Sequence, residues 1–286
     1  MLVELDYLVI GHATRDLGGD SFGIGGTAAY AARTASALGC RVGLITSADA
    51  DLDLSQALPN VLVANTLSQA TTTIENVTTA GERHQVIHQI AQPLVPAMAP
   101  ESWRPAIVHV GPVARECHPG FMSAFGTAFV GVTPQGWMRQ WDEQGQVSPC
   151  RWTGMEDVLA CADAVALSLE DVAGNWDLVA EYAAQARVLA VTQGARGCTV
   201  FAAGQTRHFP VPAVDEEDST GAGDIFAACF FYALQRDAAR SGVGDPWAAA
   251  RFANCIAAQS VTRQGLWSTP TAEEVARCRS TTLHTY

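Results

Sequence analysis

The sequence contains no lysine, so all 17 of its cationic residues are arginines. P-loops, Schiff bases and the ATP sites of protein kinases each depend on a lysine side chain. These three kinds of site are therefore excluded. A protein of this sequence that handles phosphate must do so with backbone N–H groups, arginine side chains or a metal ion.

Positive charge is scarce overall. The 29 acidic residues outnumber the arginines and give a formal net charge of −12, which argues against nucleic acid or an anionic membrane as a partner. The first residues, MLVELDYLVIG, include two acids and no basic residue, which is not the pattern of a signal peptide. No apolar run reaches the length of a membrane span. We therefore expect a cytoplasmic protein.

The eight cysteines lack the spacing of a metal or redox motif. None of them forms a CxxC pair, and most lie within apolar runs. This pattern predicts reduced cysteines in or near the core, without a disulfide framework or a zinc site.

Short apolar runs alternate with helical patterns along the 286 residues, which predicts an α/β fold with a parallel sheet. We expect buried strands at residues 5–10, 41–46, 106–110, 128–132, 164–167 and 188–192. Residues 13–26 are expected to form a loop at the carboxyl end of the first strand, where ligands bind in such folds. Hairpins are predicted at 71–90 and 198–209. We predict one domain, 1–286, that contains a β insertion at 66–92.

The most specific motif is the heptapeptide DSTGAGD at residues 218–224, which leads into the apolar run IFAACFFYAL. The run predicts a buried helix that begins close to Gly221, because each of the three preceding residues is a good N-cap. First-turn N–H groups and the helix dipole attract anions. Asp224 lies directly beyond this anion cradle. A cradle beside a carboxylate is the arrangement that phosphoryl transfer requires.

This heptapeptide resembles the DTxGAGD signature of the ribokinase-like (PfkB) carbohydrate kinase family, with Ser219 in the position of the usual threonine. The resemblance implies a ribokinase-like three-layer αβα sandwich with a mostly parallel central sheet and a small β lid. It also implies ATP-dependent phosphorylation of a hydroxyl group of a small sugar, polyol or nucleoside, with Mg²⁺ on the phosphates. In that reaction Asp224 is the base, and the N–H groups of Gly221, Ala222 and Gly223 form the anion hole.

The resemblance assigns the acceptor to the first part of the chain. There Gly25 and Gly26 open the first long helix, and Asp16 precedes them. A carboxylate accepts hydrogen bonds from sugar hydroxyls, and glycine lets a polyol approach the backbone closely. The family often has Asn where this sequence has Tyr30, so the exact polyol stays open. Taken alone, the glycine pair is equally typical of a flexible turn before a helix.

Further matches concern the donor and its ions. Residues 192–197 resemble the family's TxGxxG nucleotide segment, which implies donor contacts from Thr192, Gly194, Gly197 and, beside the adenine, Asn254. Where the family has NxxE, Glu170 or Asp171 is the candidate for a water-mediated Mg²⁺ contact. Both acids would equally suit the first turn of a helix without a metal. The resemblance also implies a monovalent cation such as K⁺, for which Asp218 and Thr220 are the candidates.

Two other functions remain open. A catalytically silent family member would bind nucleotide or polyol without turnover. A serine hydrolase would use Ser21 of the GxSxG sequence at residues 19–23, which requires a strand before the serine and a helix directly after it. Because only eight residues, 17–24, separate Asp16 from Gly25, we predict a small lid built mainly from residues 71–90. We accordingly expect a monomer or a small homodimer.

Overall fold

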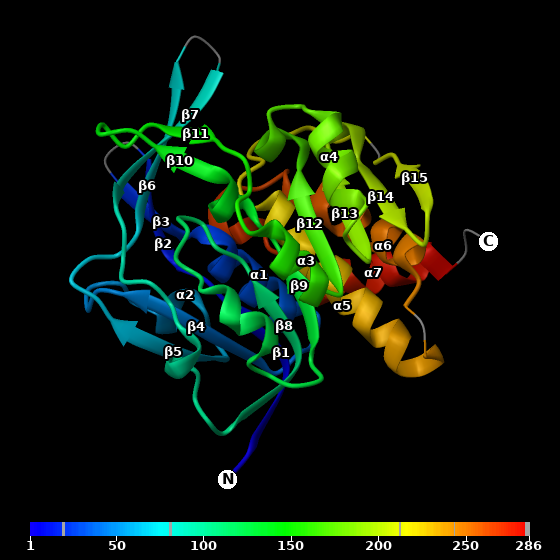
Figure 1. The fold of residues 1–286 in the computed structure, drawn as a ribbon, viewed down its shortest axis with the longest axis horizontal. Helices are drawn as coiled ribbons and strands as arrows, with labels where there is room; N and C mark the ends of the chain where they lie inside the picture. The colour runs from blue at the N-terminus through cyan, green and yellow to red at the C-terminus, as the bar shows by residue number, and fades with distance from the viewer. Residues whose placement is uncertain (19–20, 80–81, 212, 243, 284–286) are drawn as a thin grey trace.

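The computed structural model describes residues 1–18, 21–79, 82–211, 213–242 and 244–283 (Figure 1). A nine-stranded sheet runs through it in the order β15-β14-β13-β12-β9-β8-β1-β4-β5. Neighbouring strands from β13 to β5 pair in parallel. β14 pairs antiparallel with β13 on one side and with β15 on the other. Their bounds are β1 Val3–Ile10, β4 Val42–Ala48, β5 Val61–Leu67, β8 Trp103–Val110, β9 Phe129–Val132, β12 Ala164–Ser168, β13 Val188–Thr192, β14 Cys198–Ala202 and β15 Gln205–Phe209.

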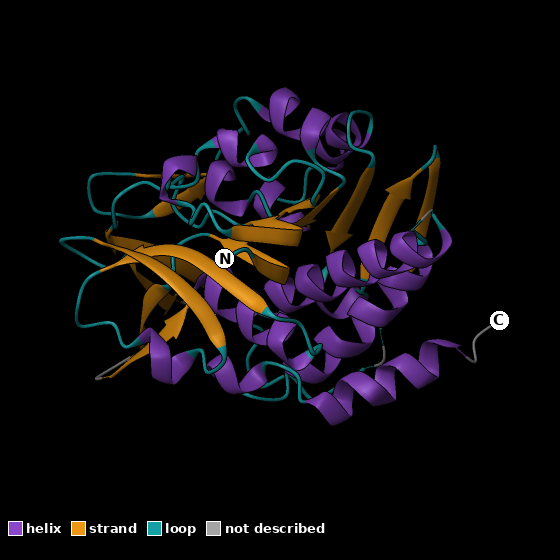
Figure 2. Cartoon of the chain, turned by 90° about the horizontal axis from the view of Figure 1, so that it is seen from below, coloured by secondary structure: helices purple, strands orange, loops and turns teal. Residues whose placement is uncertain are grey.

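Helices cover both faces of this sheet (Figure 2). The first layer contains α1 (Gly26–Ala37), α5 (Ala222–Ser241), α6 (Pro246–Ser260) and α7 (Ala272–Leu283). The second contains α3 (Met155–Cys161), α4 (Trp176–Ala183) and the 3₁₀ turn η2 (Pro119–Ser123). Short elements elsewhere are α2 (Leu54–Ala57), η1 (Pro96–Met98), η3 (Gln135–Met138), η4 (Leu169–Val172), η5 (Gly194–Arg196) and η6 (Gly265–Ser268).

Strand periodicity explains the two cores. In β1, Tyr7 and Val9 pack against the α5 layer, while Leu8 and Ile10 pack against the opposite layer. A strand that is buried on both faces reads as a continuous apolar run, which is how the parallel strands were recognised in the sequence. The predicted three-layer αβα sandwich with a mostly parallel sheet is confirmed.

The lid differs from the prediction. It is a four-stranded sheet in the order β3-β2-β6-β7, formed by β2 (Thr14–Gly18), β3 (Ser21–Gly25), β6 (Thr73–Thr79) and β7 (Glu82–Gln89). Most of the expected loop at 13–26 thus belongs to the lid, with residues 19–20 outside the described ranges. The lid is small, as predicted, but the prediction that it is built mainly from 71–90 is wrong. Asp16 and Gly25 themselves belong to the paired strands, so the short spacing between them leaves room for a hairpin. The boundary 66–92 stays a prediction.

The cysteine prediction also needs a correction. Cys255 of α6 and Cys278 of α7 form a disulfide, with their Cα atoms 5.8 Å apart. The two residues are 23 positions apart in the sequence, and only the packing of α6 against α7 brings them together. Cys40, Cys117, Cys150, Cys161, Cys198 and Cys229 carry free thiols.

Two more strands, β10 (Arg139–Trp141) and β11 (Val147–Pro149), form a separate hairpin that the sequence analysis did not predict. An isolated bridge from Gln146 to Val86 joins this hairpin to β7 of the lid. Among the helices of the described ranges, none combines the length and apolar character needed to cross a bilayer.

Candidate active site

A cavity of about 660 Å³ lies where the carboxyl ends of the parallel strands meet the lid. Thr133, Ser168 and Thr192, at or just beyond the ends of β9, β12 and β13, form part of its wall. The cavity brings together the following predicted residues: Asp16, Gly26, Glu170, Asp171, Thr192, Gly194, Gly197, Thr220, Gly221, Ala222, Gly223, Asp224 and Asn254. Gly25 and Asp218 lie just outside the wall.

The start of α5 forms the centre of the cavity. Gly221 is the N-cap and has a left-handed backbone with φ of 79°. A Cβ atom at this position would lie 2.4 Å from the ring of Tyr30, so both the conformation and the close contact require glycine. No side chain caps the helix, which corrects the expected role of residues 218–220 as direct N-caps. Gly221, Ala222 and Gly223 line the cavity at this helix start, and Ala222 N–H donates to Ser219 O at 3.2 Å.

Asp224 lies in the first turn of α5, and its Oδ1 accepts a hydrogen bond of 2.7 Å from the Thr27 hydroxyl. The pKa of this carboxyl is raised to about 6, mainly by burial and to a smaller degree by the nearby Asp171 and Asp16. The Thr27 hydrogen bond and the charge of Arg139 act in the opposite direction. The result is a carboxylate that is ionised at neutral pH and a stronger proton acceptor than an exposed aspartate.

Asp16 is held in place by its own strand and by the strand opposite. The Thr14 hydroxyl donates to its Oδ1 at 2.5 Å. A Cβ atom on Gly25 would lie 2.0 Å from Asp16 Oδ2, so the glycine makes room for the carboxylate. Gly26 has φ of +77°, and a Cβ atom there would lie 2.6 Å from His12 O. The two glycines therefore shape the acceptor side of the cavity.

Glu170 and Asp171 occupy the turn η4 directly after β12. Asp171 Oδ2 accepts the Ser168 N–H at 2.8 Å, and its Oδ1 accepts the Gln135 side-chain amide at 3.1 Å. Ser168 in turn accepts the Glu170 N–H, which completes a capping box. The Asp171 carboxylate thus stabilises the turn, whereas Glu170 is exposed on the cavity wall.

Another part of the cavity wall, where the sequence predicts donor contacts, is formed by η5, the segment after β15, and α6. Thr192, Gly194 and Gly197 line it together with Asn254, whose side-chain amide donates to Phe209 O at 2.9 Å. Gly197 has φ of +90°, and a Cβ atom there would lie 2.0 Å from Phe209 O. The remaining wall is largely apolar, comprising Val211, Ala213, Val214, Ala257, Ala258 and Val261.

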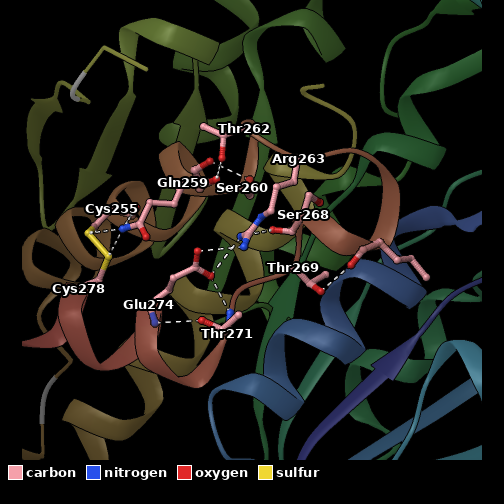
Figure 3. A network of polar contacts seen from close by, with 12 residues as sticks. Cys255, Gln259, Ser260, Thr262, Arg263, Ser268, Thr269, Thr271, Glu274 and Cys278 are labelled. Atoms are coloured by element: carbon pink, nitrogen blue, oxygen red, sulfur yellow. Dashed lines mark hydrogen bonds and ion pairs between the residues drawn. A yellow bond between two sulfur atoms is a disulfide. The ribbon is translucent and has the colours of Figure 1, made fainter. Parts of the chain in front are cut away.

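Contacts between α6 and α7 hold this wall in place (Figure 3). Besides the disulfide, Arg263 pairs with Glu274 at 3.0 Å, and Glu274 also accepts the Thr271 N–H. Val261 O accepts the N–H groups of Glu217 and Asp218. Because Val261 also lines the cavity, the end of α6 and the start of the heptapeptide form one connected unit.

Asp218 orders the turn before α5. Its Oδ1 accepts the Thr220 N–H at 2.9 Å, and its Oδ2 accepts the Gly265 N–H at 3.2 Å. These bonds join the heptapeptide to η6. A monovalent cation at Asp218 and Thr220 stays a prediction.

Among the cavity-lining side chains that sequence reasoning missed are Thr27, Asn76, Gln85 and Arg139. Thr27 follows the glycine pair directly, so its position was the one available signal. The others lie on lid strands or on the β10–β11 hairpin, and no motif marks them. For Ser21, the residues that follow it form β3 rather than a helix, which contradicts the nucleophile elbow of a serine hydrolase.

Comparisons with known proteins agree with this geometry. Residues 148–272, which include the heptapeptide and Asn254, match the model of the pfkB family carbohydrate kinases. Over these residues the chain is similar to the pfkB carbohydrate kinases. The resemblance inferred from the heptapeptide is therefore confirmed.

A curated relative is a fructokinase of Klebsiella pneumoniae, which is 31% identical over 47% of this chain and 46% of its own length. The chain therefore spans less than half the length of that relative. Two solved structures share the fold. One is a pyrophosphate-dependent kinase of the ribokinase family in complex with a pyrophosphate analog and myo-inositol, with TM-score 0.77, 22% identity and coverage of 95% of this chain and 99% of that chain. The other is the Arabidopsis thaliana ribokinase with ribose and ATP, with TM-score 0.72, 17% identity and coverage of 96% and 99%.

Proposed function

We propose that this protein is a pfkB family kinase that transfers the γ-phosphoryl group of ATP to a hydroxyl group of a small sugar, polyol or nucleoside. The observation that carries the proposal is Asp224, a half-buried carboxylate with a pKa of about 6 in the first turn of α5. It lies in the same cavity as the glycine-flanked anion cradle and the nucleotide-like segment at 192–197. A silent binding protein would have no need of a tuned base at this position.

Asp224 accepts the proton in the proposed reaction. Thr27 holds Oδ1, which leaves Oδ2 for the acceptor hydroxyl. As the hydroxyl oxygen bonds to the γ-phosphorus, the bond from that phosphorus to the bridging oxygen breaks, the proton passes to Asp224, and ADP leaves. The N–H groups at Gly221, Ala222 and Gly223 stabilise the charge on the transferring group.

A nucleotide donor fits the cavity better than pyrophosphate, which the related structure described above uses. Pyrophosphate has no apolar part, and, like the phosphates of ATP, it would be held by backbone N–H groups, Mg²⁺ and cationic side chains. Among the described residues of the wall, Arg139 is the one cationic side chain. The apolar wall near Ala257 and Val261 instead suits a purine base. A cytoplasmic location, where ATP is abundant, is consistent with this donor.

Magnesium fits as part of the donor complex. Within the described ranges, no group of three or more His, Cys, Asp or Glu side chains is arranged to hold a metal ion. Mg²⁺ keeps several waters and binds through phosphates with few protein carboxylates. We propose that Glu170, exposed on the cavity wall, faces this water shell. When bound, the ion would offset charge on the phosphates.

The test is a screen for phosphorylated products over pentoses, hexoses, inositols and nucleosides, with ATP and pyrophosphate supplied in parallel. Mass spectrometry of the acceptor detects transfer from either donor. We expect product with ATP and an equal amount of ADP, and none with Asp224→Asn above background. Product with pyrophosphate alone would overturn the donor assignment. Binding of ATP without product from any acceptor would favour the silent family member.

A further inference from the structure

The acceptor end of the cavity is the part formed by the lid and the β10–β11 hairpin. Asp16 comes from β2, Asn76 from β6 and Gln85 from β7, and Arg139 is the first residue of β10. The two units are connected, since Ile87 N donates to Gly145 O at 2.9 Å, beside the bridge between Val86 and Gln146. Side chains from both units therefore face one compartment.

This compartment carries an excess of negative charge. Asp16 and Asp171 both lie close enough to Asp224 to raise its pKa by repulsion. Arg139 is the one cationic side chain among the described wall residues, and it lowers the pKa of both Asp171 and Asp224. One of its guanidinium nitrogens also donates to Val113 O at 3.3 Å. The positive charge of one arginine thus offsets the charges of several carboxylates, and the sequence has no lysine that could contribute a further positive charge.

The uncharged polar groups of the lid match hydroxyl groups. Asn76 and Gln85 stand directly opposite each other on β6 and β7, and Gln85 Nε2 donates to Asn76 Oδ1 at 2.9 Å. Amides both donate and accept, and carboxylates accept from hydroxyl donors. A phosphate or carboxylate group on the acceptor can only accept hydrogen bonds near neutral pH, so it would face Asp16, Asp171 and Asp224. Among the described wall residues, Arg139 alone would offset that repulsion, and its charge already acts on Asp171 and Asp224.

We infer that the acceptor is a neutral polyhydroxyl compound, and that the acidic compartment beneath the Asn76–Gln85 pair excludes acceptors that carry a phosphate or a carboxylate. This inference rests on the proposed kinase function. It goes further because it divides the sugar, polyol and nucleoside acceptors by charge, and it assigns the lid amides to the recognition of hydroxyl groups.

The experiment compares matched acceptors: ribose with ribose 5-phosphate, fructose with fructose 6-phosphate, and myo-inositol with its monophosphate. The parental protein is expected to use at least one neutral acceptor with a kcat/KM on the order of 100-fold or more above that of its monophosphate, because juxtaposed like charges are strongly unfavourable. A monophosphate that is used as well as its neutral partner would overturn the inference. Absence of product from every acceptor would instead count against the proposed function.

Two variants separate charge from shape. Gln85→Lys adds a cation to the lid and is expected to reduce the preference for the neutral acceptor about tenfold, an effect that added salt should weaken. Gln85→Met has a similar length but no polar group, and it should lower kcat/KM for the neutral acceptor without improving use of the monophosphate. An unchanged preference in Gln85→Lys, or the same change in both variants, would show that charge does not exclude phosphorylated acceptors.

Discussion

Replacing Asp224 by asparagine changes chemistry and stability in opposite directions. Asn keeps an oxygen that accepts the Thr27 hydrogen bond, but it cannot take up the acceptor's proton. Loss of a general base lowers kcat by roughly 10²–10⁴-fold. ATP binding, which depends on the cradle backbone and on the wall near Thr192 and Asn254, should be unchanged. A larger side chain at Ala222 should impair both, because it alters the cradle itself.

The stability effect follows from the raised pKa. Burial raises the pKa of Asp224 from 3.8 to about 6, and one pKa unit corresponds to about 1.4 kcal/mol. The stability linked to a group whose pKa is raised on folding is fully present below the unfolded value and is lost as the pH rises through the folded value. At a pH of about 7.5 the charged carboxylate therefore costs about 3 kcal/mol, and Asp224→Asn should raise the free energy of unfolding by up to that amount.

Urea unfolding at a pH of about 7.5 and of about 4 measures this difference, which should nearly vanish at the lower pH. The pH dependence of kcat/KM gives a second measurement. In the parent it should rise through an inflection near pH 6, where Asp224 ionises. Thr27→Val should move that inflection to higher pH, because the Thr27 hydrogen bond lowers the pKa. Near-parental turnover in Asp224→Asn would remove this residue from the mechanism, and a profile without an inflection would refute the argument from its pKa.

Three further predictions concern the surroundings of the site. Glu170→Gln should raise the Mg²⁺ concentration for half-maximal activity several-fold with little change in acceptor KM. Asp171→Asn should mainly lower the free energy of unfolding, by about 1 kcal/mol, because the Asp171 oxygens accept hydrogen bonds from Ser168 N and Gln135. If neither variant alters the Mg²⁺ dependence, both acids only stabilise η4. Cys278→Ser should lower the free energy of unfolding by about 3 kcal/mol, because the disulfide no longer closes a loop in the unfolded chain. A reductant should lower the free energy of unfolding of the parent by the same amount, and no effect of the reductant would contradict the disulfide. Gly25→Ala should reduce kcat/KM for the acceptor at least about tenfold with unchanged ATP binding, because the added Cβ would collide with Asp16; normal acceptor kinetics would show that Asp16 moves aside without loss.

Local patterns predicted the parts of the fold that depend on neighbouring residues. The start of α5, the parallel strands and the segment at 192–197 each follow from short stretches whose spacing has a direct physical meaning. The lid did not follow, because β2 pairs with β6 from a distant part of the sequence, and the short strands around Asp16 show no clear alternation. β5 was missed for a related reason: it is an edge strand, only partly buried on both faces.

The missed side chains share one property: tertiary packing alone brings them to the site. Thr27 reaches Asp224 because α1 and α5 pack against each other. Arg139 arrives on a hairpin that touches the lid, and Cys278 arrives on a helix that packs on α6. Apart from the place of Thr27 directly after the glycine pair, the sequence carries no motif that marks these residues.

One arrangement of charge accounts for both the strength of the base and the proposed choice of acceptor. Asp16 and Asp171 raise the pKa of Asp224, while Thr27 and Arg139 lower it, and burial sets the value near 6. A second arginine in the compartment would admit anionic acceptors, but it would also lower the pKa of Asp224 and make it a weaker base. Removing Arg139 would have the opposite consequence, since the carboxylate would then stay protonated at a higher pH. A single cation among these carboxylates is therefore compatible with an ionised base at neutral pH and with a preference for neutral hydroxyl compounds.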